Sequence, residues 1–264
     1  SVRHGTSEIT EGATLMAAAS HAKKKIHYVA AGSSGLMALA DACELPGTFG
    51  IPAQAIRIHM AGGIPSDGHM PGNTEDDLSA CDSVSDKIHN GDTVIVLTAS
   101  GTTPYALEIA TGAKSKGAKV IGIANNPATP VLDLANVSIC LRTPPEVVAG
   151  STRLGAGTAQ KAALNLMSTQ MGIELGHVYQ GLMVNVVADN TKLVARAAGI
   201  VAQIAGVSNA EAEAALAQVD GNTKMAILVA AGCIPTQAQQ LLESCNGQLG
   251  RCFQRINTSQ NEKI

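Results

Sequence analysis

The stretch VIVLTASGTTPYALEIA, residues 94–110, joins an apolar run to a small polar turn and then to a helix. The run from Val94 to Leu97 is apolar and mostly β-branched, as in strands that are covered on both faces of a sheet. The turn SGTT follows, and Pro104 after it favours the first turn of a helix. Backbone N–H groups and hydroxyls at such a helix N-terminus attract an anion, because the helix dipole is positive there. The stretch therefore predicts a buried strand whose carboxyl end leads into an anion-binding turn.

A second unit of this kind begins at residue 26, where the strand-like IHYVAA leads into GSSG and the helical LMALADACE. Similar periodicity predicts strands and helices that alternate along the first half of the chain. Such alternation predicts a doubly wound α/β fold, with five parallel strands, helices on both faces and right-handed crossovers. The expected strands are residues 26–31, 55–61, 94–99, 118–124 and 137–142, and the expected helices between them lie around 76–89, 104–116 and 128–135.

Both polar turns follow strands, so we expect them at the carboxyl edge of the sheet, where ligands bind in folds of this class. Neither turn has the G-x-G-x-x-G spacing of dinucleotide folds or the lysine of a P-loop. Two hydroxyl-lined turns at one edge therefore favour a small phosphorylated ligand over a nucleotide. The alternative is that they are two ordinary helix N-caps.

The pattern changes after residue 143. A long helix rich in Ala, Leu and Met is expected around residues 156–174. Residues 205–233 resemble a ubiquitin-associated-type unit of three helices with Ser208 and Asn222 as caps, and a generic helical appendage is the alternative. We therefore expect two domains, residues 1–190 and residues 191–264. The short amphipathic helices of the second are expected at 191–205, 209–218, 222–231 and 235–244.

Composition narrows the class of protein. Of the 264 residues, 45% are hydrophobic and 15% are charged, which supports a folded core. The net charge of −3 and the scarcity of aromatic residues give no sign of nucleic-acid or membrane binding. Six cysteines without a C-x-x-C pair are expected to be reduced thiols of a cytoplasmic protein, and the seven histidines lack an H-E-x-x-H metal motif. No apolar run in the sequence reaches the length of a membrane span. The lack of an initial Met suggests that the numbering starts inside a longer chain or in a processed one.

Four blocks of sequence together resemble one family. PEVVAGSTRLGAGTAQKAALNLMST, residues 145–169, is similar to the characteristic stretch of N-acetylmuramic acid 6-phosphate etherases and the related glucokinase regulatory proteins. GSSGLMALADACELPGTFG (32–50), ASGTTPY (99–105) and GLMVNVVADNTKL (181–193) resemble the same family in the same order. The resemblance runs from about residue 26 to the end of the chain. It implies a sugar isomerase (SIS) domain followed by a small helical domain.

The resemblance also implies a reaction. The family removes D-lactate from the C3 ether of N-acetylmuramic acid 6-phosphate by β-elimination and then adds water, which gives N-acetylglucosamine 6-phosphate. The C1 carbonyl of the open-chain sugar acidifies the C2 proton, so a base can remove it while an acid assists the departing C3 oxygen. No metal or other cofactor is implied.

Two glutamates of the family have counterparts in this sequence. Glu44 ends the segment DACE, residues 41–44, and Glu75 lies in GNTED, residues 72–76, where it is expected to enter the next helix. The resemblance implies that both are catalytic. We assign the acid role at the ether oxygen to Glu44 and the proton transfer at C2 to Glu75, although two coupled carboxylates can exchange roles. Without the resemblance, Glu44 is a helix-end carboxylate and Glu75 a partner of a helix dipole.

The resemblance further implies the residues that bind the sugar phosphate. Ser151 and Thr152, at the start of the long helix, are candidates for the sugar or the phosphate. Arg153 and Lys161 lie in the same block and are either site residues or structural ion-pair partners. The hydroxyls that match the family's phosphate turns are Ser33, Ser34, Ser100, Thr102 and Thr103.

Three positions depart from the family pattern in one direction. Leu36 and Thr103 stand where the family has Arg, and Gly155 stands where it has Lys. The family substrate carries a phosphate and a carboxylate, for which the fork-like Arg side chain is well suited. Two alternatives to the etherase therefore stay open, a lyase or isomerase acting on another sugar phosphate and a non-catalytic sugar-phosphate sensor. The two glutamates favour an enzyme, because a sensor needs no acid–base pair.

The resemblance also implies a homodimer with its site near the subunit interface. SIS domains typically pair. The expected helix at residues 156–174 offers an apolar face that a second subunit could cover.

Overall fold

The computed structural model describes residues 2–70 and 72–261, with side chains as far as Thr258. Contacts divide the chain into two compact units. The first comprises the residues up to Glu44 together with Pro52–Met171, and the second comprises Leu45–Ile51 together with the residues from Gly172 onward. The expected boundary after residue 190 lies later in the chain than this division, and the existence of two separate domains with that boundary stays a prediction.

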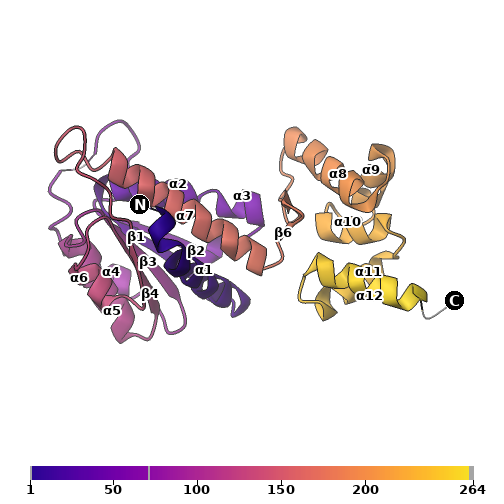
Figure 1. Ribbon diagram of the computed structural model, residues 1–264, viewed down its shortest axis with the longest axis horizontal. Coiled ribbons are helices and arrows are strands. Elements are labelled where there is room, and N and C mark those ends of the chain that lie inside the picture. The colour runs from indigo at the N-terminus through magenta and orange to yellow at the C-terminus, as the bar shows by residue number, and fades with distance from the viewer. Residues whose placement is uncertain (1, 71, 262–264) are drawn as a thin grey trace. The chain divides into compact units, whose positions relative to one another are not determined.

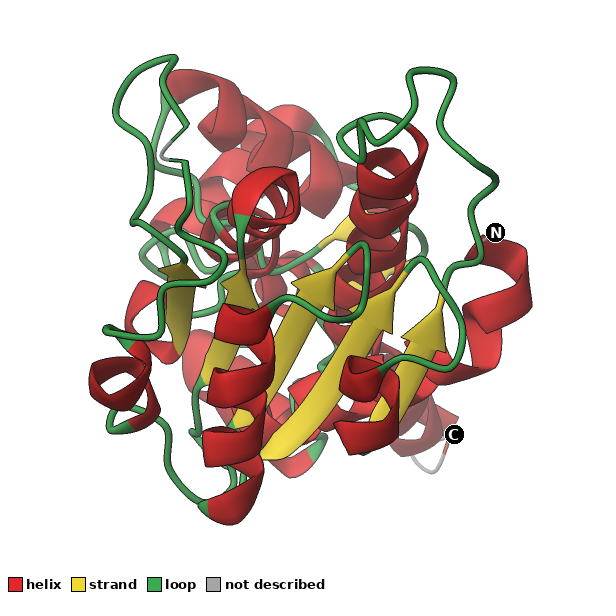
Figure 2. Ribbon diagram, turned by 90° about the vertical axis from the view of Figure 1, so that its left-hand side faces the viewer, coloured by secondary structure: helices red, strands yellow, loops and turns green. Residues whose placement is uncertain are grey.

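The first unit is built on a five-stranded sheet with the strand order β2-β1-β3-β4-β5, in which every neighbouring pair is parallel (Figures 1 and 2). The chain runs from β1 to its neighbour β2, and then from β2 back past β1 to β3 on the other side. The topological switch point therefore lies between β1 and β3. The doubly wound α/β fold is thus confirmed. The strands, all of them at the expected positions, are β1 (Ile26–Ala30), β2 (Ile56–Met60), β3 (Thr93–Thr98), β4 (Lys119–Ala124) and β5 (Val137–Cys140).

Helices cover both faces of this sheet (Figure 2). Val29, Val94 and Val96 point to the face that α5 covers, where they form an apolar core with Ile109. Tyr28 points to the opposite face, because side chains alternate along a strand, and its hydroxyl donates to Asp41 of α2. The helical elements of the unit are η1 (Val2–Gly5), α1 (Thr6–His21), α2 (Gly32–Ala42), η2 (Ala53–Ala55), α4 (Cys81–Ser85), α5 (Pro104–Ser115), α6 (Pro130–Leu134) and α7 (Gly155–Glu174) as far as Met171, from where α7 belongs to the second unit.

One helix is much shorter than the sequence predicts. A helix was expected around residues 76–89, but only Cys81–Ser85 is helical. Asn73 has a positive φ of 58°, and the Asp77 carboxylate accepts the N–H of Ser79 at 2.9 Å. Such local bonds from an Asp side chain compete with helix formation. Glu75 therefore lies in an irregular segment and does not enter a helix.

The second unit is largely helical. Ser208 caps α9, and its hydroxyl and Glu211 form a capping box, while the Asn222 side chain accepts the N–H of Met225 at the start of α10. Both predicted caps and the four predicted helices are confirmed. The elements are α3 (Leu45–Phe49), the hairpin β6 (Val178–Tyr179) and β7 (Leu182–Met183), α8 (Thr191–Ala205), α9 (Asn209–Ala217), α10 (Thr223–Ala230), α11 (Pro235–Ser244) and α12 (Leu249–Asn261).

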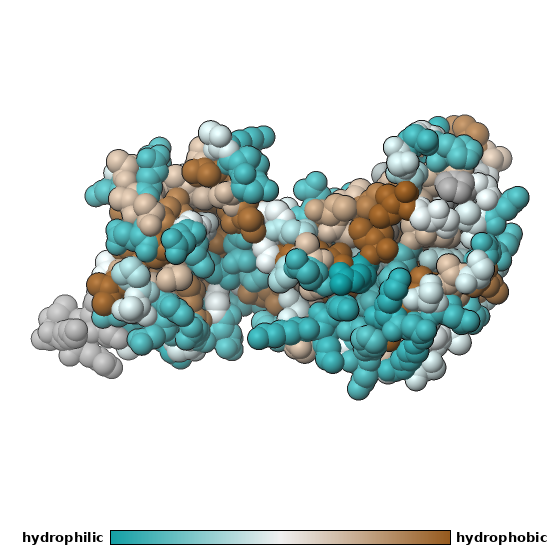
Figure 3. Space-filling view, turned by 180° about the vertical axis from the view of Figure 1, so that it is seen from behind, coloured by the Kyte–Doolittle hydropathy of each residue, from teal (hydrophilic) through white to brown (hydrophobic). Residues whose placement is uncertain are grey.

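Each unit shows polar and apolar side chains on its surface, and the apolar ones gather in patches (Figure 3). Within the described ranges, no single helix has both the length and the apolar character needed to cross a membrane, and two bent helix pairs meet that test only by length and composition. All six cysteines are free thiols.

Candidate active site

A cavity of about 130 Å³ opens at the switch point of the sheet. Ala30 at the end of β1 pairs with Leu97 of β3, so the polar turns that follow these two strands lie next to each other. Both turns line this cavity, which we call the cradle. Its lining consists of Ala31, Ser33, Ser34, Glu75, Leu97, Thr98, Ala99, Ser100, Thr103 and Thr152.

The two helices that begin at the cradle have no side-chain caps. Ala31 is the N-cap of α2 and has no capping atom, and the Thr103 side chain does not cap α5. The alternative interpretation of the turns as ordinary side-chain caps therefore fails. A helix N-terminus without a cap leaves N–H groups for another acceptor, and an anion is the acceptor that the dipole favours. Both helix N-termini thus direct positive potential into one cavity.

A chain of hydroxyls fixes the turn after β3. The Thr98 hydroxyl lies 2.8 Å from that of Thr103 and 3.2 Å from that of Ser100, and it accepts the N–H of Gly101 at 3.2 Å. Gly101 has a φ of +80°, and a Cβ there would come within 2.3 Å of the Thr129 hydroxyl oxygen. Glycine is therefore required at this turn. Sequence reasoning missed Thr98, although it ends the quoted strand and faces the same edge.

We expect Ser100→Ala to weaken binding of a sugar phosphate by roughly 2–10-fold, the effect of losing one hydrogen bond. The reason is that Ser100 lines the cradle and also accepts the Thr102 hydroxyl at 3.0 Å. Binding can be followed by the ligand-induced rise in thermal unfolding temperature. Ser115→Ala, at the opposite end of α5, is the control and should bind like the original chain. Equal weakening in both variants would contradict the role of Ser100.

The Glu75 carboxylate lies against the N-terminus of α2. A Cβ on Gly32 would approach Glu75 Oε1 to 3.0 Å, so the carboxylate lies directly beside the first residue of this helix. The backbone oxygen of Glu75 accepts the N–H of Tyr105 at 3.1 Å, which ties the irregular segment to α5. The α2 dipole favours negative charge at this place. Glu75 is the only carboxylate in the lining of the cradle, as the described residues define it.

Replacement of Gly32 by Ala is expected to displace Glu75. Gly32 has a φ of +51°, which costs an alanine about 1–2 kcal/mol, and the added methyl group would meet the carboxylate. We expect the rate of any reaction in which Glu75 transfers a proton to fall by roughly 10–100-fold, the range for a small misplacement of a reacting group. Gly199→Ala adds a methyl group to helix α8 with no other atom within 4 Å and serves as the control. Unchanged kinetics in Gly32→Ala would show that Glu75 needs no such close approach.

Glu44 lies far from the cradle of its own chain. It is exposed in the turn after α2, and its N–H donates to the Asp41 oxygen at 3.1 Å. Because a helix rises about 1.5 Å per residue, α2 places Glu44 ~16 Å from Gly32. Glu75 lies beside Gly32. A single chain therefore does not bring the two predicted catalytic glutamates together.

The other candidates divide between the cavity and the surroundings. Thr152 lines the cradle, whereas Ser151, Thr102 and the exposed Arg153 are not in its lining. Lys161 Nζ lies 3.8 Å from the Asp41 carboxylate and also donates to Asn165. Lys161 is thus the ion-pair partner of a buried carboxylate on α2.

That carboxylate joins β1, α2 and α7. Asp41 is 3% exposed and accepts the Tyr28 hydroxyl at 3.0 Å and the Ser168 hydroxyl at 3.1 Å. Burial raises the pKa of Asp41, and the hydrogen bond from Tyr28 and the charge of Lys161 oppose this rise. Lys161 thus helps to keep a charge on the buried Asp41, and a site role for Lys161 stays a prediction.

A second cavity, of about 340 Å³, adjoins the cradle and shares Ala99, Ser100 and Thr152 with it. We call it the side cavity. Asn125, which is 4% exposed, lies in its wall and is held by a hydrogen bond of 2.9 Å from Gln160 Nε2. Sequence reasoning missed this wall, although the amides follow β4 at the carboxyl edge. The remaining lining residues are Asn126, Thr143, Pro144, Pro145, Glu146 and Ala156.

Glu146 occupies the N-terminus of α7. Its two carboxylate oxygens accept the N–H groups of Gly155 and Ala156, each at 2.8 Å. A Cβ on Gly155 would lie 3.1 Å from Glu146 Oε2, so glycine gives this carboxylate room. The start of α7 therefore holds an internal anion in place of a ligand.

The three departures from the family pattern now have positions. Gly155 accommodates Glu146, and Thr103 is buried in the hydroxyl chain. Nothing in the structure explains Leu36. Among the described residues that line the cradle and the side cavity there is no Lys or Arg. Their positive potential comes from helix N-termini alone.

Comparison with known proteins agrees with this architecture. Residues 2–125 match the SIS domain family. An N-acetylmuramic acid 6-phosphate etherase of Aeromonas hydrophila is 39% identical over 248 residues, which cover 93% of this chain and 83% of the relative. The etherase of Psychromonas ingrahamii is 40% identical over 244 residues, covering 91% of this chain and 82% of the relative.

Among solved structures, a Bacteroides fragilis protein assigned as a phosphosugar isomerase involved in capsule formation is similar with a TM-score of 0.51. It is 18% identical, and the match covers 66% of this chain and 82% of that protein, which shows the fold alone. The etherase relatives match at much higher identity over most of their length. This chain belongs to the N-acetylmuramic acid 6-phosphate etherase family.

Proposed function

We propose that this enzyme is an N-acetylmuramic acid 6-phosphate etherase, a carbon–oxygen lyase that releases D-lactate from the C3 ether of its substrate. The observation that carries the proposal is the cradle, where two uncapped helix N-termini and a hydroxyl chain meet the carboxylate of Glu75. The phosphate binds at the helix N-termini of α2 and α5. The sugar then extends past Glu75 toward the side cavity.

The reaction follows from this placement. Glu75 removes the C2 proton of the open-chain sugar, and the electron pair of the C–H bond forms a C2–C3 double bond as the C3–O bond breaks. A second carboxyl group protonates the departing lactate oxygen. Water then adds to C3, and a proton returns to C2, which gives N-acetylglucosamine 6-phosphate. Acid–base groups of this kind contribute about 10²–10⁴-fold each, and the proposed steps need only the two carboxyl groups.

The second carboxyl group is Glu44 of the partner subunit in a homodimer. Within one chain Glu44 is ~16 Å from the cradle, which is too far to touch the same sugar as Glu75. Exposed apolar side chains support a subunit interface, namely Val147 (99% exposed) and Val148 (61%) beside the side cavity and Leu166 (48%) on α7. Sedimentation that shows only monomer at micromolar concentration would contradict the homodimer.

We place the enzyme in the cytoplasm, in the recycling of cell-wall amino sugars. Six free thiols suit a reducing compartment. The product is an ordinary amino-sugar phosphate, which suits a step that returns cell-wall sugars to metabolism.

A second candidate function is the binding or conversion of another sugar phosphate. The lack of Lys and Arg in the described cavity linings favours it, since a lactyl carboxylate would meet no cation from its own chain. Glu146 adds negative charge to the side cavity. A ligand without a carboxylate would avoid this charge.

Incubation with N-acetylmuramic acid 6-phosphate, with enzymatic detection of D-lactate, tests the proposal. Release that depends on Glu75 is the expected result. Protection against thermal unfolding without release would favour the second candidate function. If the protein neither releases D-lactate nor is protected against thermal unfolding, both functions are contradicted.

A further inference from the structure

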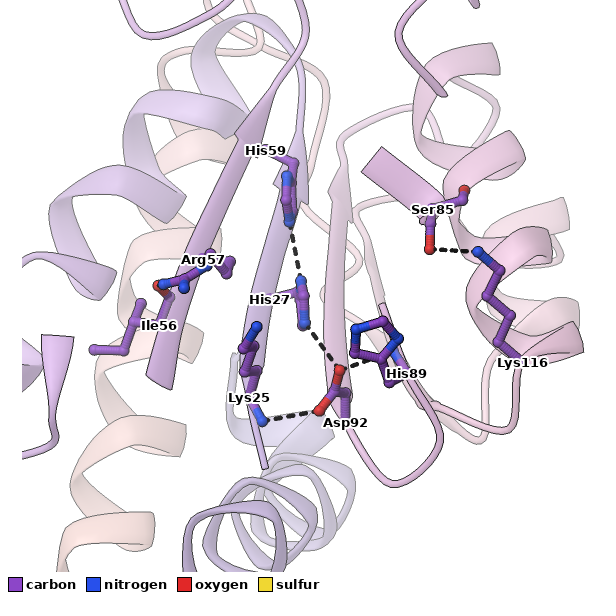
Figure 4. Close-up of polar contacts among 9 residues, drawn as sticks. All are labelled: Lys25, His27, Ile56, Arg57, His59, Ser85, His89, Asp92 and Lys116. Carbon is purple, nitrogen blue, oxygen red and sulfur yellow. Dashed lines mark hydrogen bonds and ion pairs between the residues drawn. The ribbon is translucent and has the colours of Figure 1, made fainter. Parts of the chain in front are cut away.

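A line of buried polar side chains crosses the sheet on the face opposite Tyr28. His27 Nδ1 lies 2.9 Å from His59 Nε2, and His27 Nε2 lies 3.3 Å from Asp92 Oδ2 (Figure 4). His27 is fully buried, Asp92 is 2% exposed and His59 is 8% exposed. The sequence analysis and the proposed reaction give none of the three a role. We call them the histidine chain.

Hydrogen-bond chemistry orients the protons of this chain. Asp92 also accepts the N–H groups of Lys25 and His89, each at 2.9 Å. Burial alone would raise the pKa of Asp92, but these two N–H groups and His27 outweigh burial and leave the pKa below its usual value. An ionised carboxylate only accepts, so His27 Nε2 donates to it. His27 Nδ1 then accepts from His59 Nε2 in the neutral chain, and the free lone pair is on His59 Nδ1.

The histidine chain can bind one more proton. A proton at His59 Nδ1 leaves both hydrogen bonds intact, and transfer along the chain can place the positive charge on His27 beside Asp92. A second proton would set two N–H groups against each other between the rings. The histidine chain therefore takes up a single proton, and its titration belongs to the pair.

His59 lies in the wall of a third cavity, of about 420 Å³, whose lining also includes Thr74 and Asp77. Figure 4 shows the second ring nitrogen of His59 on the side away from His27. Thr74 and Asp77 belong to the irregular segment that also carries Glu75. Tyr105 lines this cavity too, and its N–H holds the Glu75 backbone oxygen. One segment, residues 74–77, thus shares a cavity with the histidine chain and also carries Glu75.

We propose that the histidine chain is a positioning device for Glu75. When it takes up its one proton, the charge attracts Asp77 across the cavity and draws the segment of residues 74–77, with Glu75, away from the cradle. Asp77 is the only carboxylate among the described lining residues of this cavity. The positive groups near the chain, Lys25, Arg57 and Lys87, oppose its protonation.

The pH range of the device follows from the two histidines. Burial lowers the pKa of His59 to about 4, with further lowering by His27, Lys87 and Arg57. Burial also lowers the pKa of His27, against the opposing effect of Asp92. Both folded pKa values lie below the ordinary 6.5, so the unfolded chain binds more protons and stability falls as pH drops from 6.5 toward 4. Hydrogen bonds from Ser79 lower the pKa of Asp77, which therefore stays ionised over most of this range.

A single tryptophan reports on the segment, because the chain has no tryptophan of its own. Leu78→Trp places the reporter next to Asp77, at a position that is 46% exposed. We expect its emission maximum to shift in one single-proton step between pH 6.5 and 4. His59→Gln in this background keeps an N–H donor for His27 and removes the titrating nitrogen, so the step should be lost or displaced by at least one pH unit.

Two further variants make the test specific. His89→Gln removes an exposed ring whose residue contributes only its backbone N–H to Asp92, so the step should be unchanged. Asp92→Asn removes the charge that favours the cation, so the step should move to lower pH. Emission that does not change with pH, or an identical step in His59→Gln, would overturn the proposal.

Ring nitrogen NMR of the unsubstituted chain gives a readout that needs no variant and no activity. At pH 7 we expect proton-bearing Nε2 in both histidines and a bare Nδ1 in His59, and the reverse tautomer would overturn the assignment. The role of Glu75 rests on the proposed function, and its readout is the acid limb of the kcat/KM profile, which should move in His59→Gln and not in His89→Gln. If the chain releases no lactate at any pH, the etherase proposal fails, while the emission step still decides whether the histidine chain moves the segment.

Discussion

Replacement of Glu75 by Gln is expected to lower kcat for D-lactate release by about 10²–10⁴-fold, the contribution of a general base. Gln has nearly the same size and cannot accept the C2 proton. The substitution leaves unchanged the hydroxyls of Ser33, Ser34 and Ser100, for which we propose phosphate contacts, so the substrate should still protect the variant against thermal unfolding. Turnover is measured by coupled oxidation of D-lactate, and binding by the shift in unfolding temperature.

Asp76→Asn is the matched control for this substitution. Asp76 is the next residue, exposed and outside the lining of the cradle, so its loss of charge should leave kcat within a few-fold of the original value. A Glu75→Gln variant that retains its turnover would exclude Glu75 as the base. Equal losses in both variants would point to a general effect of charge on the segment.

Mixed dimers of Glu44→Gln and Glu75→Gln chains are expected to recover activity that neither variant has alone. In a two-fold symmetric dimer whose sites each combine Glu75 of one chain with Glu44 of the other, one site of every mixed dimer is intact. Random reassembly of equal amounts should therefore restore about a quarter of the original activity. The measurement is D-lactate release after joint unfolding and refolding, or after co-expression with two affinity tags.

The control for this experiment is a mixture of Glu75→Gln with Gly32→Ala. Both substitutions alter the same half of the site, so every site in the mixed dimer has one defect and activity should not rise above that of the parents. If the mixture of Glu44→Gln and Glu75→Gln also recovers no activity, both glutamates act within one chain or Glu44 has no part in the reaction. The distance along α2 argues against the first of these.

The strands were predictable because each is a short apolar run with a polar turn behind it. β1 and β3 are buried along their whole length. Because neither strand has a face in water, polar surface residues do not interrupt its apolar run. The meeting of the two turns followed from topology, since neighbouring parallel strands end at the same edge. The distance of Glu44 from the cradle could also have been derived from the length of α2.

Other features depend on contacts that sequence periodicity does not contain. The segment around Glu75 is not helical, because the Asp77 carboxylate accepts the backbone N–H of Ser79. Such a side-chain hydrogen bond competes with the backbone hydrogen bonds of a helix. α1 was not among the expected helices. Its buried face combines Ile9 and Met16 with Gly and Ala residues, and Gly12 lies against Met167 and Ile121. Glu146 reaches the start of α7 across a loop, and nothing in its spacing from Gly155 marks it as a cap.

The origin of the positive potential in the cradle has a consequence for ligand titration. Backbone N–H groups and hydroxyls do not change charge between pH 5 and 8, and the described lining contains no Lys, Arg or His. The backbone N–H groups and hydroxyls that would bind the phosphate therefore keep the same charge over that range. Affinity should follow the second ionisation of the phosphate ester, which lies at about pH 6. Any additional bend in a plot of affinity against pH would come from carboxyl groups or from histidines outside the cradle. A titration of ligand affinity therefore distinguishes ionisation of the phosphate from ionisation of the protein.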